Sequence, residues 1–436
     1  MNYKLIYIII GVIFIYAGSI NAQVPSPVPS QNKPIILMGG TAHLGNGEVI
    51  ENSAIAFENG KITTVSKADN LNLDFTAYEV INVEGKHVYP GLILANTSLG
   101  LVEIGGVRAT VDSRETGTLN PNVRSIIAYN TDSEVIPTLR SNGILLAQIT
   151  PQGGVVSGSS TIVQLDAWNW EDAAYKTDDA IHLNWPGMFQ RSGREASSGT
   201  TKNPNYDKTV ALLDKLFTDA VAYNKLKDPK TTNMKLVAMK GLFDGSQKLF
   251  IRAGYVKEIV ESIKFAKKHG VKGIVLVGGD EDAWRVKDFL KENNIPVIVA
   301  NLHRLPKRKD EDVKMPFKLP YLFYKEGILT GLDYPRTTSS MNLPFYAGTA
   351  AAYGLTKEEA LMTITSNMAK ILGINDKVGT IEKDKDANII VSTGDLLDIR
   401  TSNVEYAFIN GRKIDLDNKH KRLYRKFKEK YDKQGK

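Results

Sequence analysis

The chain has 436 residues, 42% of them apolar and 24% charged, which is typical of a globular protein long enough to bury a sizeable core. The absence of cysteine excludes a disulfide scaffold, a thiolate zinc site, an iron–sulfur cluster, a cysteine nucleophile and a lipidated N-terminal cysteine. The net charge of +7 is carried by residues 411–436, which hold eleven Lys and Arg against four Asp and Glu, so it describes a tail and does not indicate a nucleic-acid-binding domain.

Residues 1–22 are typical of an export signal. Lys4 supplies a positive end, residues 5–16 form an almost unbroken apolar run, and residues 17–22 are mostly small. Because the run is shorter than the roughly 20 residues that span a bilayer comfortably, we expect cleavage after Ala22, with an uncleaved anchor as the alternative. No later segment is apolar enough to cross a membrane, and we expect an exported protein, periplasmic or extracellular.

Residues 23–33 are rich in proline and serine and have no apolar period, which predicts an extended tether. Residues 34–89 contain short β-rich runs separated by glycine-containing turns, at 35–38, 53–57, 62–66 and 78–83. This pattern predicts a small antiparallel module that forms the first part of a β-sandwich.

Residues 90–375 alternate apolar strand-like runs with helical periods, which favours parallel βα units. The clearest helical period covers residues 357–373, with Thr356 as its N-cap. Strands return in residues 376–414, so we expect one sheet domain split between the two ends of the chain, with a βα domain inserted. Residues 415–436 form a basic amphipathic tail, which predicts a docked terminal helix with a solvated basic face or a helix that binds a membrane surface or an acidic partner.

Four segments together resemble a known family, and they read IAFENGKITTVS (55–66), VINVEGKHVYPGLI (80–93), GLTKEEALMTITSNMAKILGI (354–374) and VGTIEKDKDANIIV (378–391). On these segments the chain resembles the amidohydrolase superfamily, specifically its imidazolonepropionase-like and dihydroorotase-like metal-dependent hydrolases. The charged stretches 112–115 and 132–134 resemble a secreted branch of it. The resemblance implies an α/β fold, a TIM-like (β/α)8 barrel inserted into a composite β-sandwich, with the active site at the carboxyl ends of the barrel strands.

The metal ligands of the family are replaced in this chain. The family's first barrel strand carries a His-x-His pair, but Asn96 and Ser98 stand at those places in LILANTSLGL. Arg252 and the Gly278-Gly279 turn stand where histidines follow on the fifth and sixth strands. The resemblance leaves only the eighth-strand aspartate, a metal ligand and general base in the family, and its counterpart is Asp333. The family therefore implies a divalent metal such as zinc, whereas these residues predict none.

The supply of histidine agrees with this prediction. The chain has six histidines, of which only His182 and His303 are placed to reach the barrel mouth. Zinc needs three or four nitrogen, sulfur or anionic oxygen ligands, and neutral amide and hydroxyl oxygens are poor substitutes.

Arg252 adds an electrostatic argument. A guanidinium about 5 Å from a divalent ion opposes its binding by roughly 6–7 kcal/mol at an effective dielectric constant of about 20. We therefore predict that Arg252 takes over the charge of the metal and approaches Asp333, directly or through one water or side chain. The alternative is a pair between Arg252 and a loop carboxylate such as Glu115 or Asp280.

Three functions remain open from the sequence. The resemblance implies a hydrolase of non-peptide C–N bonds in a small amide or cyclic amide, in which Asp333 is catalytic and moves the proton. The substituted ligands predict instead a catalytically inactive homologue that binds a small molecule or joins an active paralogue in a homo- or hetero-oligomer. Metal-free hydrolysis by Asp333 and another group is the third function. In each, the site is expected to be lined by Asn96, Ser98, Arg252, Gly278, Gly279 and His303.

Overall fold

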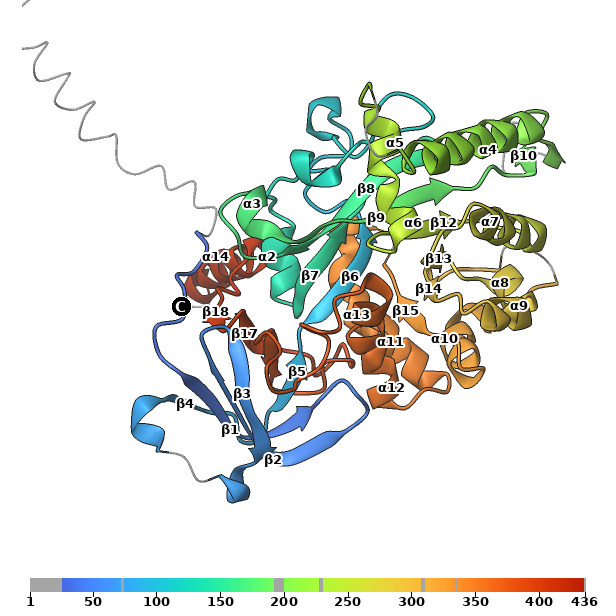
Figure 1. Cartoon of the computed structure of the whole chain (residues 1–436). Coiled ribbons are helices and arrows are strands. Elements are labelled where there is room, and N and C mark those ends of the chain that lie inside the picture. The colour runs from blue at the N-terminus through green and yellow to red at the C-terminus, as the bar shows by residue number, and fades with distance from the viewer. Residues whose placement is uncertain are drawn as a thin grey trace, which may run out of the picture.

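The computed structural model describes residues 26–434 except 72–73, 192–199, 227–229, 307–309 and 335. The predicted signal, residues 1–22, lies outside the described residues. Two eight-stranded sheets form the body, one built from both ends of the chain and one that curves into a barrel with helices around it (Figure 1). Among the described helices, none is both long enough and apolar enough to cross a bilayer.

The first sheet joins the two ends of the chain. Its strands are β1 (Ile35–His43), β2 (Val49–Glu58), β3 (Lys61–Lys67), β4 (Glu79–Asn82), β5 (His87–Pro90), β16 (Ile389–Ser392), β17 (Val404–Ile409) and β18 (Arg412–Lys413). Their order is β18-β17-β16-β5-β1-β2-β3, with β4 also beside β1, and β16 pairs antiparallel with β5. Phe57 and Phe408 pack edge to face in the shared core, with ring centroids 5.0 Å apart. The predicted composite sheet is confirmed, because neither end of the chain has enough strands to bury its own face.

The prediction of a purely antiparallel module is wrong in one respect. β1 pairs parallel with both β4 and β5. Residues 68–78, which include the 3-10 turns η1 (Ala68–Asn70) and η2 (Phe75–Ala77), connect β3 to β4. A connection of this length lets the chain cross the sheet and return in the direction of β1, which a short hairpin turn cannot do.

The second sheet forms the barrel. Its strands are β6 (Leu92–Thr97), β7 (Ile144–Ile149), β8 (Val156–Gln164), β9 (Ala174–Asn184), β12 (Lys248–Arg252), β13 (Ile274–Val277), β14 (Val297–Val299) and β15 (Thr330–Leu332), and they follow one another in chain order. Neighbouring strands pair in parallel except β8, which is antiparallel to β7 and β9. The TIM-like barrel is confirmed with this correction, because residues 150–155 are too few for a crossover helix between β7 and β8.

Helices and short elements complete the inserted domain. Helix α7, for example, directs Ile259, Ile263 and Ala266 into the core. The elements are η3 (Arg108–Thr110), η4 (Ser125–Ala128), α2 (Ile136–Arg140), α3 (Trp170–Ala173), β10 (Phe189–Arg191), β11 (Thr200–Lys202), α4 (Tyr206–Tyr223), α5 (Met234–Ala238), α6 (Lys240–Asp244), α7 (Val256–Lys268), α8 (Glu281–Arg285), α9 (Lys287–Glu292), α10 (Met315–Lys325), η5 (Thr337–Asn342) and α11 (Leu343–Ala352).

The predicted continuous helix over residues 357–373 is wrong, because the chain forms two helices, α12 (Lys357–Met362) and α13 (Ser366–Leu372). The predicted N-cap is confirmed, since Thr356 and Glu359 form a capping box. Between the helices, the carbonyl of Thr363 accepts from Leu332 N at 3.1 Å and that of Ile364 accepts from Ile93 N at 2.9 Å. The break therefore connects the edge strands β15 and β6, which closes the barrel.

The ends of the described chain lie on the same region of the body. Residues 26–33, the described part of the predicted tether, form no helix or strand. Val28 donates its backbone N–H to Asp166 Oδ2 at 3.2 Å, and its carbonyl accepts from Arg412 at 3.0 Å. Helix α14 (Lys419–Gln434) follows and lies beside α2 (Figure 1).

Candidate functional site

A cavity of about 490 Å³ lies where the carboxyl ends of the barrel strands meet. Its lining includes five polar side chains from different strand ends, Asn96, Asn184, Arg252, Asp280 and Asp333. We call it the mouth cavity. In barrels of this kind the strand ends hold the functional groups, because the loops that follow them converge on one face.

Asp333 is the buried acid of the mouth cavity. It follows β15, and only 1% of its surface is exposed. Its Oδ2 accepts a 2.8 Å hydrogen bond from Asn96 Nδ2, while Oδ1 has no partner among the described residues. Burial raises the pKa of Asp333 to about 6, and the bond from Asn96 and the charge of Arg252 oppose this rise only in part.

Arg252 reaches Asp333 through Asn96. Its Nη2 donates to Asn96 Oδ1, and its Nη1 donates to Asn184 Oδ1 at 3.3 Å. Burial lowers the pKa of the guanidinium, and the nearby Asp333 charge raises it. The predicted approach of Arg252 to Asp333 through one side chain is confirmed in this geometry.

Asn96 can bridge the two charges because its backbone is unusual. Its φ is +54°, in the left-handed region that asparagine tolerates better than most residues, and its N–H donates to Gln148 Oε1 at 3.1 Å. The pairing of β6 with β7 shifts between Leu94 and Thr97. Because of this shift, the side chains of Asn96 and Ser98 do not share one face of the strand, although they are two residues apart. Ser98 Oγ lies 2.9 Å from Thr337 Oγ1.

A buried polar network continues inside the barrel below Asn96. Gln148 Nε2 donates to Asp179 Oδ2 at 2.7 Å, and Ser160 Oγ donates to Asp179 Oδ1 at 2.8 Å. His182 Nε2 lies 2.9 Å from Ser160 Oγ. Burial raises the pKa of Asp179 to about 6 and lowers that of His182 well below its usual value. Sequence reasoning named only His182 of this set, although single polar residues in apolar strands, such as the glutamine of ILLAQI, were a usable signal.

The remaining predicted residues are placed differently. Gly278 lines the mouth cavity, with φ +89°. At Gly279 an added Cβ would lie 2.3 Å from Val297 Cγ1, so a larger side chain requires movement of β14. His303 lines another cavity, of about 660 Å³, where its Nε2 lies 2.8 Å from Thr349 Oγ1. His182 lies inside the barrel, below the mouth.

The side chains present do not fit a divalent metal. In the ranges described, no group of three or more His, Asp or Glu is arranged to hold an ion. The places of the family ligands hold an amide, a hydroxyl, a guanidinium and glycine, and one of these carries a positive charge. Among the places of the family ligands only that of Asp333 holds an anionic oxygen, and it is already bonded to the amide. The other carboxylate of the mouth cavity, Asp280, accepts from backbone N–H groups at the start of α8.

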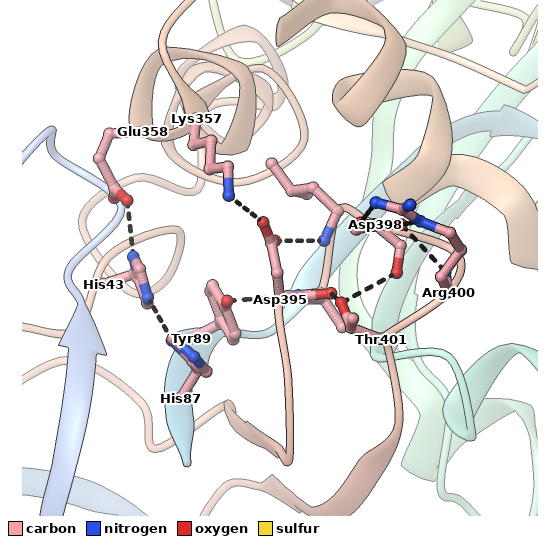
Figure 2. A network of polar contacts seen from close by, with 11 residues as sticks. His43, His87, Tyr89, Lys357, Glu358, Asp395, Asp398, Arg400 and Thr401 are labelled. Atoms are coloured by element: carbon pink, nitrogen blue, oxygen red, sulfur yellow. Dashed lines mark hydrogen bonds and ion pairs between the residues drawn. The ribbon is translucent and has the colours of Figure 1, made fainter. Parts of the chain in front are cut away.

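A second polar cluster lies between the first sheet and the barrel (Figure 2), and we call it the junction cluster. His43 Nδ1 lies 2.6 Å from Glu358 Oε1 on α12, and His43 Nε2 lies 3.0 Å from His87 Nδ1 on β5. The ring of His43 stacks on Tyr89, with centroids 4.5 Å apart and planes 7° apart. The contact between His43 and Glu358 therefore links the first sheet to α12, while His87, which lies in the same sheet as His43, occupies the other nitrogen of that imidazole.

Comparison with known proteins gives a consistent assignment. Residues 241–414 match the model of the amidohydrolase family. The chain is 31% identical over 193 residues to an imidazolonepropionase from Flavobacterium psychrophilum, a match that covers 38% of this chain and 47% of that protein. The chain thus matches about half the length of this curated relative.

Solved structures show the same architecture. An amidohydrolase from Thermotoga maritima superposes with a TM-score of 0.76 at 22% identity, covering 87% of this chain and 99% of that one. An adenosine deaminase from Xanthomonas campestris with bound zinc superposes with a TM-score of 0.55 at 14% identity, covering 93% and 99%. At these identities the likeness establishes the fold.

Proposed function

Because the chain belongs to the amidohydrolase superfamily, we propose that it uses the barrel mouth of that superfamily to bind a small polar molecule without a divalent metal. The observation that carries the proposal is the bridge from Arg252 through Asn96 to Asp333. A buried carboxylate needs a compensating charge. Here the guanidinium of Arg252 supplies that charge.

The chemistry of the mouth cavity fits an amide or cyclic amide. Arg252 supplies N–H donors suited to a carbonyl oxygen, and Asp333 supplies a carboxyl group suited to an amide N–H. Asn184 positions Arg252 instead, because its Nδ2 already donates to the carbonyl of Gly154 and to Ser157 Oγ. A volume of about 490 Å³ lies in the range of small-molecule sites.

Binding and metal content together test this proposal. Elemental analysis of the purified protein should find no stoichiometric zinc, iron or manganese. At least one compound among acetamide, succinimide and hydantoin should raise the Tm of the protein, and a chelator should not change this rise. Arg252→Lys keeps the charge but loses the fork toward Asn96 and Asn184, so binding should weaken at least about tenfold. Arg400→Lys, at an exposed ion pair, is the matched control. About one tightly held metal per chain, lost together with hydrolysis in Asp333→Ala, would contradict the proposal.

A second candidate function, metal-free hydrolysis of a C–N bond, is favoured by the state of Asp333. A carboxyl group with a pKa of about 6 and an unbonded oxygen suits a general base. Asp333 would take a proton from water, the hydroxide would add to the amide carbonyl carbon, and the C–N bond would break as Asp333 returns the proton to the leaving nitrogen. Metal-free hydrolysis would be recognised by turnover of a compound of the same panel. The rate should rise as the pH increases through about 6 and should be lost in Asp333→Asn.

Export is part of the proposal and is supported by residues 1–22. The mature chain would then begin near Gln23. N-terminal sequencing that returns Met1 from a membrane fraction would contradict this.

A further inference from the structure

Helix α14 presents its apolar side chains to solvent. Its sequence is KHKRLYRKFKEKYDKQ, and none of its residues is buried. The exposed fractions are 42% for Leu423, 67% for Tyr424, 48% for Phe427 and 62% for Tyr431. We call these four residues the apolar stripe. A terminal helix of a soluble protein usually turns such a stripe toward its own core.

Charges are sorted around the apolar stripe. At about 100° per residue, Leu423, Phe427 and Tyr431 follow one another along the helix, and Tyr424 lies beside them. Lysines border the stripe on both sides, Lys419, Lys426 and Lys430 on one and Lys421 and Lys428 on the other. The two acidic residues lie on the opposite side of the helix, at Glu429 and Asp432.

The side opposite the stripe attaches the helix to the body. Arg422 is half-buried and lies 3.4 Å from Glu134, and Arg425 lies 2.8 Å from Asp417. Asn418, which precedes the helix, donates to Ser141 Oγ at 2.8 Å. The helix is therefore docked, as the sequence allowed, but through its arginines, so the apolar stripe points outward.

We propose that α14 lies on an anionic lipid bilayer, with the apolar stripe in the interface and the bordering lysines on lipid phosphates. Aromatic side chains favour the boundary between headgroups and acyl chains, and each lysine near an anionic surface adds attraction. An acidic protein or nucleic acid would be attracted by the lysines alone. Four apolar side chains between two lysine rows favour the bilayer over these partners.

Vesicle sedimentation of the full chain tests the proposal. The protein should bind phosphatidylcholine vesicles that contain phosphatidylglycerol, bind weakly to phosphatidylcholine alone, and dissociate in high salt. Replacing the lysines of one border (Lys419→Gln, Lys426→Gln, Lys430→Gln) should weaken binding by roughly a hundredfold, from about fivefold per lysine. Phe427→Ser with Tyr431→Ser should weaken it at least about tenfold.

Matched variants keep the result interpretable. Phe427→Leu with Tyr431→Trp should bind like the wild type, and Val237→Ser, at another exposed apolar residue, should change nothing. All variants should keep the wild-type Tm, because no residue of α14 is buried. Binding that is unchanged in every α14 variant would place the attachment outside α14 and overturn the proposal. Binding to single-stranded DNA or polyglutamate but not to vesicles would overturn it as well.

Discussion

The mouth cavity and the junction cluster each hold a carboxylate with one bonded oxygen and one that has no partner in the described part of the chain, Asp333 and Glu358. Asp333 faces a cavity and is bonded to an amide that also carries a guanidinium. Glu358 is bonded to His43, whose ring is covered by Tyr89. Asp333 lines a cavity although only 1% of it is exposed, and Glu358 lies beside an imidazole that stacks on a tyrosine ring.

The difference shows where this chain uses imidazole. His43, bonded to His87 in its own sheet, joins that sheet to Glu358 of α12, whereas the barrel mouth contains amides, a guanidinium and carboxylates. Four variants test whether the junction cluster and the barrel interior, that is the mouth cavity and the network below it, have different roles.

The largest effect is expected from Arg252→Met. Removing the guanidinium leaves Asp333 buried without a compensating charge, which should lower the free energy of unfolding by about 3–5 kcal/mol. Adding Asp333→Asn to this variant should recover much of the loss in urea unfolding. Arg400→Met, whose ion pair is exposed, should be indistinguishable from wild type. A double variant no more stable than Arg252→Met would show that the bridge contributes packing and not charge.

A smaller, pH-dependent effect is expected from Asp179→Asn. The folded pKa of Asp179 is raised to about 6 from 3.8, so its contribution to stability is present below pH 3.8 and lost as the pH rises through about 6. Measured against wild type, the variant should gain up to about 3 kcal/mol of relative stability between pH 4 and pH 7. Urea unfolding at both pH values measures this gain, and a difference that is flat across the range would contradict it.

The relative stability of His87→Phe should change with pH in the direction opposite to that of Asp179→Asn. Burial, and then the charge of His43, lower the folded pKa of His87, while Asp395 and Glu51 raise it and Lys357 lowers it. Its contribution to stability is present above the unfolded value of 6.5 and is lost as the pH falls through the folded value. The variant should therefore gain relative stability on acidification from pH 7.5 to pH 5, less than Asp179→Asn gains in its range. The folded pKa of His182 is lowered as well, so acidification acts on the wild type through both histidines. The stability curve of His87→Phe, compared with that of the wild type, isolates the contribution of His87.

The smallest effect is expected from Glu358→Gln. The glutamine oxygen can still accept from His43, so only the charge is lost, at a cost of about 1 kcal/mol. Glu84→Gln, at an exposed position, is the control. A loss as large as that of Arg252→Met would mean that both clusters depend equally on charge.

Much of the fold follows from periodicity and from the four family-like segments. The joint sheet and the inserted βα units were predictable because alternation and turn residues are local signals, whereas the closed barrel was implied by the resemblance to the family. The antiparallel β8 was not, since strand direction depends on how the connections cross the sheet. The break at residues 363–365 was also hidden, because the helical period continues while the backbone carbonyls there bond the edges of the barrel.

The site was predictable in its charges but not in its backbone. The link between Arg252 and Asp333 follows from the cost of burying either charge alone. The left-handed Asn96 that makes the link does not, since its neighbours read as an ordinary strand. Asp179 was missed because its partners come from two other strands, which the sequence does not align.

The two carbonyls at Thr363 and Ile364 have a consequence for biosynthesis. Both edge strands of the barrel stay open until this segment has left the ribosome, and the first sheet also waits for β16. During most of translation the nascent chain therefore exposes strand edges that can pair with other chains. A chain truncated before residue 363 should accumulate as aggregate. The full-length chain should fold only after residues 363–392 have been synthesised.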